Sequence, residues 1–200
     1  MRADTARADV RDSILDAAER LLSLYGYSKT TIEDIAQEAG IGKGTVYLHF
    51  HSKEEIAVSF IDRVNQRVRA RLQEIAESDA PAAERVREML IARVMVRLDT
   101  ARNHDKSIDE LLRSVRPLLI CCRQRWHEAE AEVLAGVLRD GRTRGEFSFD
   151  DDMTAARTLV LATNSVLPYN LSTRQLGERE EMLKAASQIA GLLLNGLCKR

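Results

Sequence analysis

Residues 40–53 of the chain read Gly40-Ile41-Gly42-Lys43-Gly44-Thr45-Val46-Tyr47-Leu48-His49-Phe50-His51-Ser52-Lys53. The segment before them, residues 30–39, predicts a helix, because a threonine can cap its start, acidic residues lie in its first turn and Gly40 can end it. A second short helix is expected from about Gly42. Two short helices joined by a glycine turn predict a helix-turn-helix, in which the second helix is the recognition helix.

The charge of the whole chain does not predict nucleic-acid binding, because its net charge is −1. The local distribution does favour it. Residues 39–53 contain no acidic side chain, whereas Lys43, His49, His51 and Lys53 lie there. This surface is therefore expected to be locally positive within a neutral domain.

Composition indicates a cytoplasmic protein with one large or two small domains. Hydrophobic residues make up 44% of the 200 residues, and no apolar run approaches the roughly 20 residues that cross a bilayer. The first residues lack the apolar stretch of a secretory signal. Three cysteines, Cys121, Cys122 and Cys198, are odd in number and two are adjacent, which favours free thiols in a reducing compartment over a disulfide framework.

Apolar spacing predicts helices throughout, so the expected fold is all-α. The apolar set from Ile14 to Tyr25 has the period of one buried helical face, and Ile35, Ala36, Ile41, Val46 and Phe50 would pack beneath it. We expect a three-helix domain at residues 9–52 and a second helical domain at 53–200, which begins with a connecting helix at 53–77. About nine helices are predicted, near residues 14–25, 31–40, 42–50, 53–76, 82–101, 107–116, 117–142, 153–167 and 177–197.

Several of these boundaries rest on local signals. Capping boxes are predicted at Ser52–Glu55 and Ser107–Glu110, where each serine and glutamate can satisfy free backbone donors. Pro117 suits the first position of a new helix, and Pro168 suits a stop. Gly141 and Gly145 are expected to end the long middle helix, and Asp150 to Asp152 to charge the start of the next one.

With this pattern, the chain resembles TetR-family transcriptional regulators. About fifty residues carry the resemblance: Ala17-Ala18 and Leu21-Leu22, the segment Thr31 to Ile41, the run Lys43 to Phe50, and the Ser52-Lys53-Glu54-Glu55 cap. Residues beyond about 80 match only in architecture. The resemblance implies a non-enzymatic homodimer that binds a palindromic operator in double-stranded DNA and represses a promoter until a small molecule enters the C-terminal half.

The expected DNA contacts lie in and around the two short helices. By position, Thr31, Thr45, Tyr47 and Lys53 resemble the family's phosphate contacts, which set register without reading sequence. Lys43 could reach guanine, Gly42 and Gly44 would allow close approach, and Leu48 could meet a thymine methyl. The full expected set is Thr31, Gly42, Lys43, Gly44, Thr45, Tyr47, Leu48, His49 and Lys53.

Two further sites are expected in the C-terminal half. An effector pocket between the helices around 83–101, 107–138 and 153–169 would be lined by Met95, Leu119, Arg123, Trp126, His127, Glu130, Asn164 and Tyr169. The apolar stripes of the last two helices are wide enough for a four-helix bundle between two subunits, the alternative being an intramolecular core alone. The expected dimer seam is Val160, Leu167, Leu183, Ala186, Ala190, Leu193 and Leu197.

Other functions fit the sequence less well. Gly42-Lys43 resembles part of a phosphate-binding loop, but position 37 is Gln where a Walker pattern needs Gly, and a helix precedes it. Cys121, Cys122, His127 and Cys198 lack metal-ligand spacing, so we expect no metal and no cofactor, with redox or metal sensing as the minor alternative. A helical small-molecule-binding protein with a secondary helix-turn-helix, and an activator acting by position, also stay open.

Overall fold

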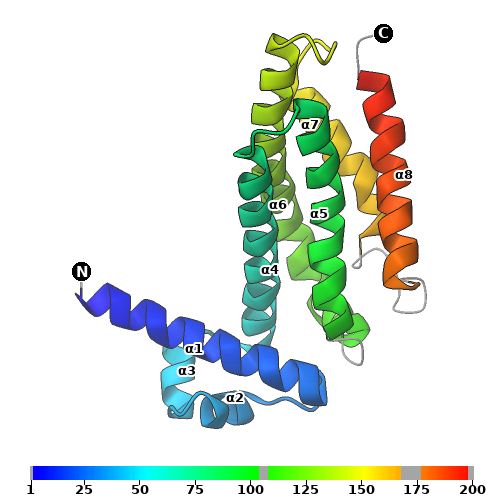
Figure 1. The fold of residues 1–200 in the computed structure, drawn as a ribbon. Helices are drawn as coiled ribbons and strands as arrows, with labels where there is room; N and C mark the ends of the chain where they lie inside the picture. Colours follow the sequence, from blue (N-terminus) through cyan, green and yellow to red (C-terminus); the bar gives the residue numbers. More distant parts are fainter. Residues whose placement is uncertain (1, 104–107, 168–176, 198–200) are drawn as a thin grey trace. The chain divides into compact units, whose positions relative to one another are not determined.

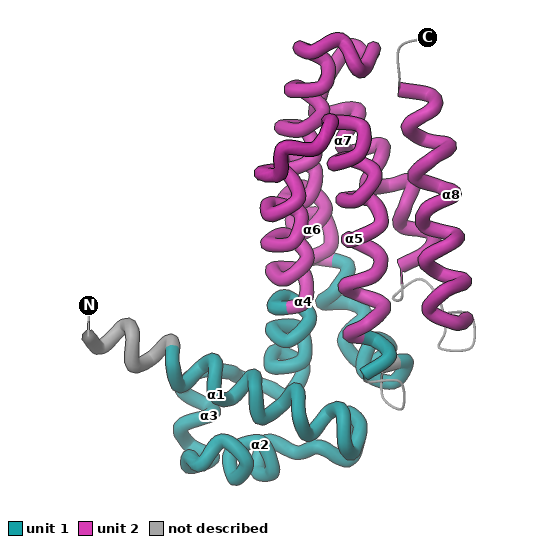
Figure 2. The backbone as a smooth tube through the Cα atoms, in the orientation of Figure 1, with its two compact units in different colours: residues 1–63, 101–120 teal, residues 64–100, 121–200 magenta. Residues whose placement is uncertain are grey.

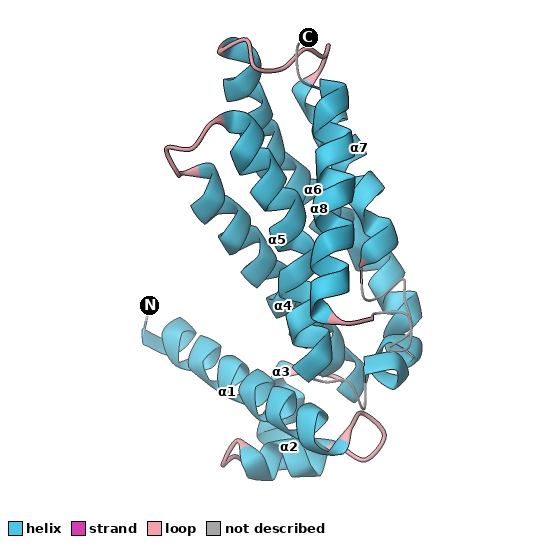
Figure 3. Ribbon diagram, turned by 45° about the vertical axis from the view of Figure 1, so that its right-hand side comes forward, coloured by secondary structure: helices cyan, strands magenta, loops and turns pink. Residues whose placement is uncertain are grey.

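The computed structural model describes residues 2–103, 108–167 and 177–197, with side chains from residue 9 onward except that of Ile108 (Figure 1). Every regular element in these ranges is a helix, as Figure 3 shows, which confirms the all-α prediction. There are eight α-helices and one 3₁₀ turn among the described residues: α1 (Arg2–Tyr25), α2 (Ile32–Glu38), α3 (Lys43–His49), α4 (Lys53–Ala76), α5 (Ala82–Asn103), α6 (Ile108–Thr143), α7 (Asp152–Ala162), η1 (Thr163–Val166) and α8 (Arg179–Leu197).

The chain forms two compact units (Figure 2). Unit 1 contains residues 1–63 and 101–120, and unit 2 contains residues 64–100 and 121–200. Helices α4, α5 and α6 each contribute residues to both units. The boundary predicted between residues 52 and 53 lies inside unit 1. Among the described residues, we find no helix with the length and apolar character that crossing a membrane requires.

The core of unit 1 contains most of the predicted apolar set, but Tyr25, which was expected on the buried face of α1, is 60% exposed. Ile14, Leu15 and Ala18 of α1 pack with Ile35 of α2 and Val46 of α3. Phe50, which directly follows α3, is also fully buried. Burying a side chain of this size stabilises the fold by about 1.5–3 kcal/mol, so Val46 and Phe50 fix which face of α3 is turned inward.

Local signals end and begin the short helices as predicted. Thr31 caps α2 in a capping box with Asp34. Gly40 has φ +69°, a left-handed conformation that favours glycine. At the start of α4 the Ser52 hydroxyl accepts from the Glu55 N–H at 3.2 Å. The Glu55 carboxylate accepts from the His51 N–H at 2.7 Å, one residue earlier than a standard box places this bond.

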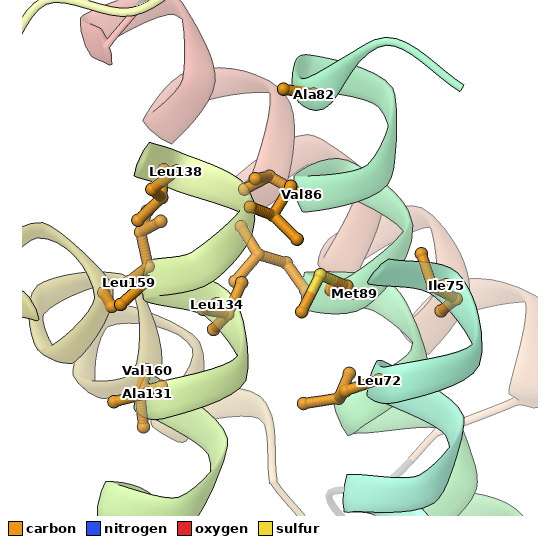
Figure 4. Close-up of a cluster of buried hydrophobic side chains, with 14 of the residues drawn as sticks. Leu72, Ile75, Ala82, Val86, Met89, Ala131, Leu134, Leu138, Leu159 and Val160 are labelled. Atoms are coloured by element: carbon orange, nitrogen blue, oxygen red, sulfur yellow. The ribbon is translucent and has the colours of Figure 1, made fainter. Parts of the chain in front are cut away.

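The core of unit 2 joins five helices (Figure 4). Leu72 and Ile75 of α4, Met89 of α5, Leu134 of α6 and Leu159 of α7 belong to one buried cluster. Ala190 and Leu194 of α8 complete it. The helices run side by side as a bundle within this unit, so the stripe of each helix is closed by its neighbours.

One predicted helix boundary in the middle of the chain is wrong. Pro117 lies inside α6 and does not begin a new helix. The helix continues although proline removes one backbone donor. Leu111 and Val115, in the turns before Pro117, are buried, whereas the turns directly after it are half-buried or exposed. The predicted end near Arg142 is confirmed, since α6 ends at Thr143 and the turn is made at Gly145 with φ +78°, although Gly141 itself lies inside the helix.

Of the predicted boundaries of α7, the start is confirmed and the end is not. The Asp151 carboxylate accepts from the Thr154 N–H at 2.7 Å and caps α7, which confirms the predicted acidic start. The predicted helix at 153–167 is an α-helix only to Ala162, after which the chain tightens into η1. Ser107 and Pro168 lie outside the described residues.

Candidate nucleic-acid interface and ligand site

Helix α3 presents an outward face that the core does not use. Val46 is fully buried beneath the helix. On the opposite side, the Tyr47 side chain is 47% exposed and the Leu48 side chain 73% exposed. Lys43 and Gly44 are exposed as well. Large apolar side chains at this exposure are available to contact a partner along one side of the helix.

Lys43 is held by an acidic residue of the preceding helix. Its Nζ donates to Glu33 Oε2 at 3.0 Å. This hydrogen bond and the negative charge of Glu33 raise the pKa of Lys43 above its ordinary value. Both side chains are about half exposed or more, so the ion pair is weak and can be exchanged for another anion.

Lys53 has a structural role in unit 1. Its Nζ donates to the carbonyl oxygens of Tyr27 at 3.0 Å and Thr30 at 3.1 Å. The same atom lies 4.1 Å from the centroid of the Tyr27 ring. Lys53 therefore ties the start of α4 to the loop before Thr31, with two of its three donors used on backbone oxygens. Its expected contact with phosphate stays a prediction.

The Tyr27 ring beneath Lys53 is part of the same arrangement. The Tyr27 hydroxyl donates to Glu54 Oε1 at 3.0 Å. Burial raises the pKa of Tyr27 well above its ordinary value, and Glu54 adds to the rise. Tyr27 thus stays neutral and keeps its role as a donor.

Thr31 is engaged in the cap of α2. Its Oγ1 accepts from the Asp34 N–H at 3.2 Å and donates to Asp34 Oδ2 at 2.7 Å. The hydroxyl hydrogen bond, with the backbone N–H of Thr31, lowers the pKa of the Asp34 carboxyl. Gly42 is exposed, whereas Thr45 and His49 are half-buried at the rim of the same surface.

Unit 2 contains a buried polar cluster, formed by Arg93 and Arg97 of α5, Glu130 of α6, and Thr163 and Asn164 of η1. Arg93 is fully buried and Glu130 is 1% exposed. Arg93 Nε donates to Glu130 Oε2 at 2.7 Å, its Nη1 donates to the Val160 carbonyl at 3.0 Å and to the Thr163 hydroxyl, and its Nη2 donates to Asn164 Oδ1 at 3.2 Å.

Arg97 completes this cluster from one turn further along α5. Its Nη1 donates to the Arg93 carbonyl at 2.8 Å. Its Nη2 donates to Asn65 Oδ1 at 2.5 Å and to the Glu130 carboxylate. Burial raises the pKa of Glu130, but Arg93 and Arg97 outweigh it, so the pKa lies below its ordinary value. The carboxylate is charged at neutral pH.

The structure brings only some of the predicted effector residues together. Glu130 and Asn164 meet at Arg93. His127 lies within electrostatic reach of Arg123, Arg93 and Glu130, and its pKa is lowered to about 4, first by burial and then by the neighbouring arginines. Met95 is buried, Trp126 is half-buried, and Leu119 lies in the part of α6 that belongs to unit 1. Tyr169 lies outside the described residues.

Arg93 and Arg97 organise this cluster, and neither was among the residues predicted to line the effector site. Their positions in the sequence of α5 nevertheless indicate a buried polar site. The apolar face of α5 includes Val86 and Leu90, and the two arginines continue it at three and seven residues after Leu90. Charged residues in line with an apolar stripe indicate a buried ion pair or a polar site, because a solvated charge would lie on the opposite face.

Four residues of the expected dimer seam are buried in the core of unit 2. Val160, Leu167, Ala186 and Ala190 are at most 1% exposed within a single chain. Leu193 and Leu197 pack partly against the same core, and Leu183 is 37% exposed. The stripe on α7 and α8 is therefore closed largely within the chain. Leu161 and Leu192, outside the predicted set, are 63% and 74% exposed, and the dimer seam stays a prediction.

Unit 1 also has a shallow open depression of about 670 Å³. It is lined by α1 side chains and by Asn103, and it does not include the predicted effector residues. Among the described residues, no group of three histidine, cysteine or acidic side chains is placed to hold a metal ion. Cys121 is exposed and Cys122 half-buried, while Cys198 lies outside the described residues.

Comparison with known proteins agrees with this geometry. Residues 14–59 match the family model described as bacterial regulatory proteins, tetR family. The chain is 26% identical over 189 residues to the fatty acid metabolism regulator protein of Bacillus subtilis, covering 92% of this chain and 93% of the relative.

Solved structures share the whole fold. A transcriptional regulator from Cytophaga hutchinsonii has a TM-score of 0.76 at 23% identity, covering 93% of this chain and 97% of that one. A structure titled as a complex of SmeT with triclosan has a TM-score of 0.58 at 23% identity, covering 96% of this chain and 92% of that one. Helix α3 (Lys43–His49), with its exposed face, lies within residues 14–59, which match the family model.

Proposed function

We propose that this chain, which belongs to the TetR family of DNA-binding transcriptional regulators, is a repressor that binds a palindromic operator as a dimer and leaves it when a small molecule binds to unit 2. Regulators of this family are not enzymes. The observation that carries the proposal is the outward face of α3, where Lys43, Tyr47 and Leu48 are exposed while Val46 is fixed in the core.

The chemistry of this face suits a major groove. Lys43 can donate to guanine O6 and N7, and Leu48 can meet a thymine methyl group. The Tyr47 hydroxyl can donate to a phosphate, which positions the helix without reading sequence. Glu33 holds Lys43 in the free protein, so DNA must replace this carboxylate with its own acceptors.

Dimerisation supplies the remaining specificity. A recognition helix as short as α3, seven residues long, reads only a few base pairs. Two copies on half-sites about 34–36 Å apart double the sequence that is read. Since much of the predicted seam is core, we place the contact between subunits on the outward side of α8, around Leu192.

Release by a small molecule follows from the helices that both units share. Helix α4 runs from Lys53, in unit 1, to Ala76, in unit 2. A ligand that binds one arrangement of unit 2 more tightly shifts the population toward it, by no more than its differential affinity. The triclosan complex of SmeT and the fatty acid metabolism regulator make apolar compounds the first class of effector to test.

The first experiment is selection of bound fragments from genomic DNA by the purified full-length protein. One selected palindrome is then titrated with the parent protein and with two variants, Tyr47→Phe and Lys43→Gln. Tyr47→Phe should weaken binding to all sequences alike and leave the salt dependence unchanged, because it removes a hydrogen bond but no charge. Lys43→Gln should change which half-site is preferred. Full affinity and unchanged preference in both variants would place the interface elsewhere.

A further inference from the structure

The buried polar cluster of unit 2 has more positive than negative charge. In the part of the chain that the structure describes, Arg93 and Arg97 share one carboxylate, that of Glu130. Asn65, Thr163 and Asn164 contribute neutral partners. Arginine does not lose its proton in a protein, so the cluster keeps one excess positive charge.

The two described titratable neighbours on this face of α6 carry no negative charge. His127 is neutral at physiological pH, because its pKa is about 4. Arg123 is a basic residue on the same face, four residues before His127 and seven before Glu130. A buried charge that is only partly compensated is costly, and its retention at this position calls for an anion.

One donor of Arg97 is directly available for such an anion. Its Nε is buried and has no hydrogen-bond acceptor among the described residues. Glu130 is buried, whereas His127 and Arg123, on the same face of α6, are half-buried. The partly exposed side chains next to the carboxylate along this face are thus a neutral imidazole and a cation.

We propose that the effector of this protein is an apolar acid whose anionic group binds at Arg97, beside the Glu130 carboxylate. This inference rests on the proposed function of unit 2 as the effector-binding part. An apolar body suits the interior around this cluster, because Val94 and Leu98 of α5 and Leu134 of α6 are fully buried near it in the sequence. A small inorganic anion would lose its hydration without gaining apolar contact.

The test uses two fluorescent probes of nearly the same shape and the full-length protein without DNA. The first, 1-anilinonaphthalene-8-sulfonate, carries a sulfonate, and the second, N-phenyl-1-naphthylamine, is neutral. Each becomes bright when it enters an apolar site. We expect one anionic probe to bind per chain, at least tenfold more tightly than the neutral one. Equal affinity of the two probes, or failure of the anionic probe to bind, would overturn the proposal.

Variants assign the preference to Arg97. Arg97→Gln should abolish the tenfold difference, and Arg97→Lys, which keeps the charge, should retain part of it. Arg87→Gln on the same helix is the matched control, because Arg87 is exposed; it should bind both probes as the parent does. Circular dichroism reports whether each variant is folded. If Arg97→Gln does not fold, the parent's preference for the anionic probe and the result for Arg97→Lys decide whether the anion binds at Arg97.

The proposed regulatory function and the proposed anion site can be tested independently of each other. If the anionic probe binds through Arg97 but leaves binding to the selected palindrome unchanged, the anion site stands and control by this site is wrong. If the protein binds no palindrome, the regulator proposal fails while the probe titration still decides the anion site. Loss of probe preference in Arg87→Gln as well as in Arg97→Gln would show a general effect of charge and would overturn the assignment.

Discussion

Among single residues, two basic side chains of unit 1 have different surroundings. Lys43 makes one exposed ion pair, whereas Lys53 donates to two backbone carbonyls and covers the Tyr27 ring. The sequence placed both in one group of expected DNA contacts. Their side chains differ because Lys53 begins α4 beside the loop between α1 and α2, and nothing in the residue spacing indicates this proximity.

Lys53→Gln should therefore lower the free energy of unfolding by about 1–3 kcal/mol, since hydrogen bonds from a charged donor to buried or half-buried acceptors are lost. Lys43→Gln is the control, and its change should be below about 1 kcal/mol, as for other exposed pairs. Urea unfolding of the two variants and the parent measures this. Equal stability of the two variants would show that Lys53 does not hold the loop.

His127 should make unfolding depend on pH. Its pKa is about 4 in the folded protein against 6.5 ordinarily, mainly because burial disfavours the imidazolium. The unfolded chain therefore binds more protons between these values, and the contribution of His127 to stability, complete above pH 6.5, is lost as the pH falls toward 4. His127→Gln should lose less stability than the parent between pH 7 and pH 5. Parallel urea midpoints for both proteins across this range would contradict the assignment.

At the scale of elements, the short helices were predictable and the long one was not. Thr31, Asp34 and Gly40 act within a few residues of one another, so their capping and turn chemistry is visible in the sequence. Helix α6 continues through Pro117, although the local signal of a proline predicts a helix start there. The partners of Arg93, more than thirty residues away in α6 and η1, are set by packing, although the position of the arginine in an apolar stripe was a visible sign.

Gly141 gives a test of packing at the end of α6. A Cβ added there would lie 2.5 Å from two carbons of the Phe147 ring and 2.7 Å from the Ala82 Cβ. Gly141→Ala should therefore destabilise the protein by about 1–3 kcal/mol through overpacking. Gly136→Ala is the matched control in the same helix, where a Cβ would meet nothing within 4 Å.

At the Gly136 position the substitution should stabilise the helix by about 0.5–1 kcal/mol, because alanine is favoured over glycine in a helix interior. Thermal unfolding of the two variants should thus move in opposite directions from the parent. If both rise, the contact between Gly141 and the Phe147 ring is not close in solution. If both fall, α6 does not continue as a regular helix to Thr143.

At the scale of the whole molecule, the sequence predicted two helical domains but placed the boundary by motif. Helices α4, α5 and α6 contribute residues to both units, so the units are not consecutive in the sequence. An apolar stripe also does not say which partner covers it. Ala186 and Ala190 are closed by the chain's own core, whereas Leu192 is turned away from it.

The dimer should consequently depend on Leu192 and not on Ala190. Leu192 is 74% exposed in the single chain, so Leu192→Glu should leave the stability of the folded chain within about 0.5 kcal/mol. In a dimer that buries Leu192, the same carboxylate would be desolvated without a partner. Sedimentation should then show monomers, and binding to a palindromic site should weaken while binding to a half-site is retained.

Ala190→Glu is the contrasting variant, since Ala190 is fully buried, and it should unfold the protein and not merely dissociate it. A stable dimer of Leu192→Glu with full affinity for the palindrome would remove this face of α8 from the contact between subunits.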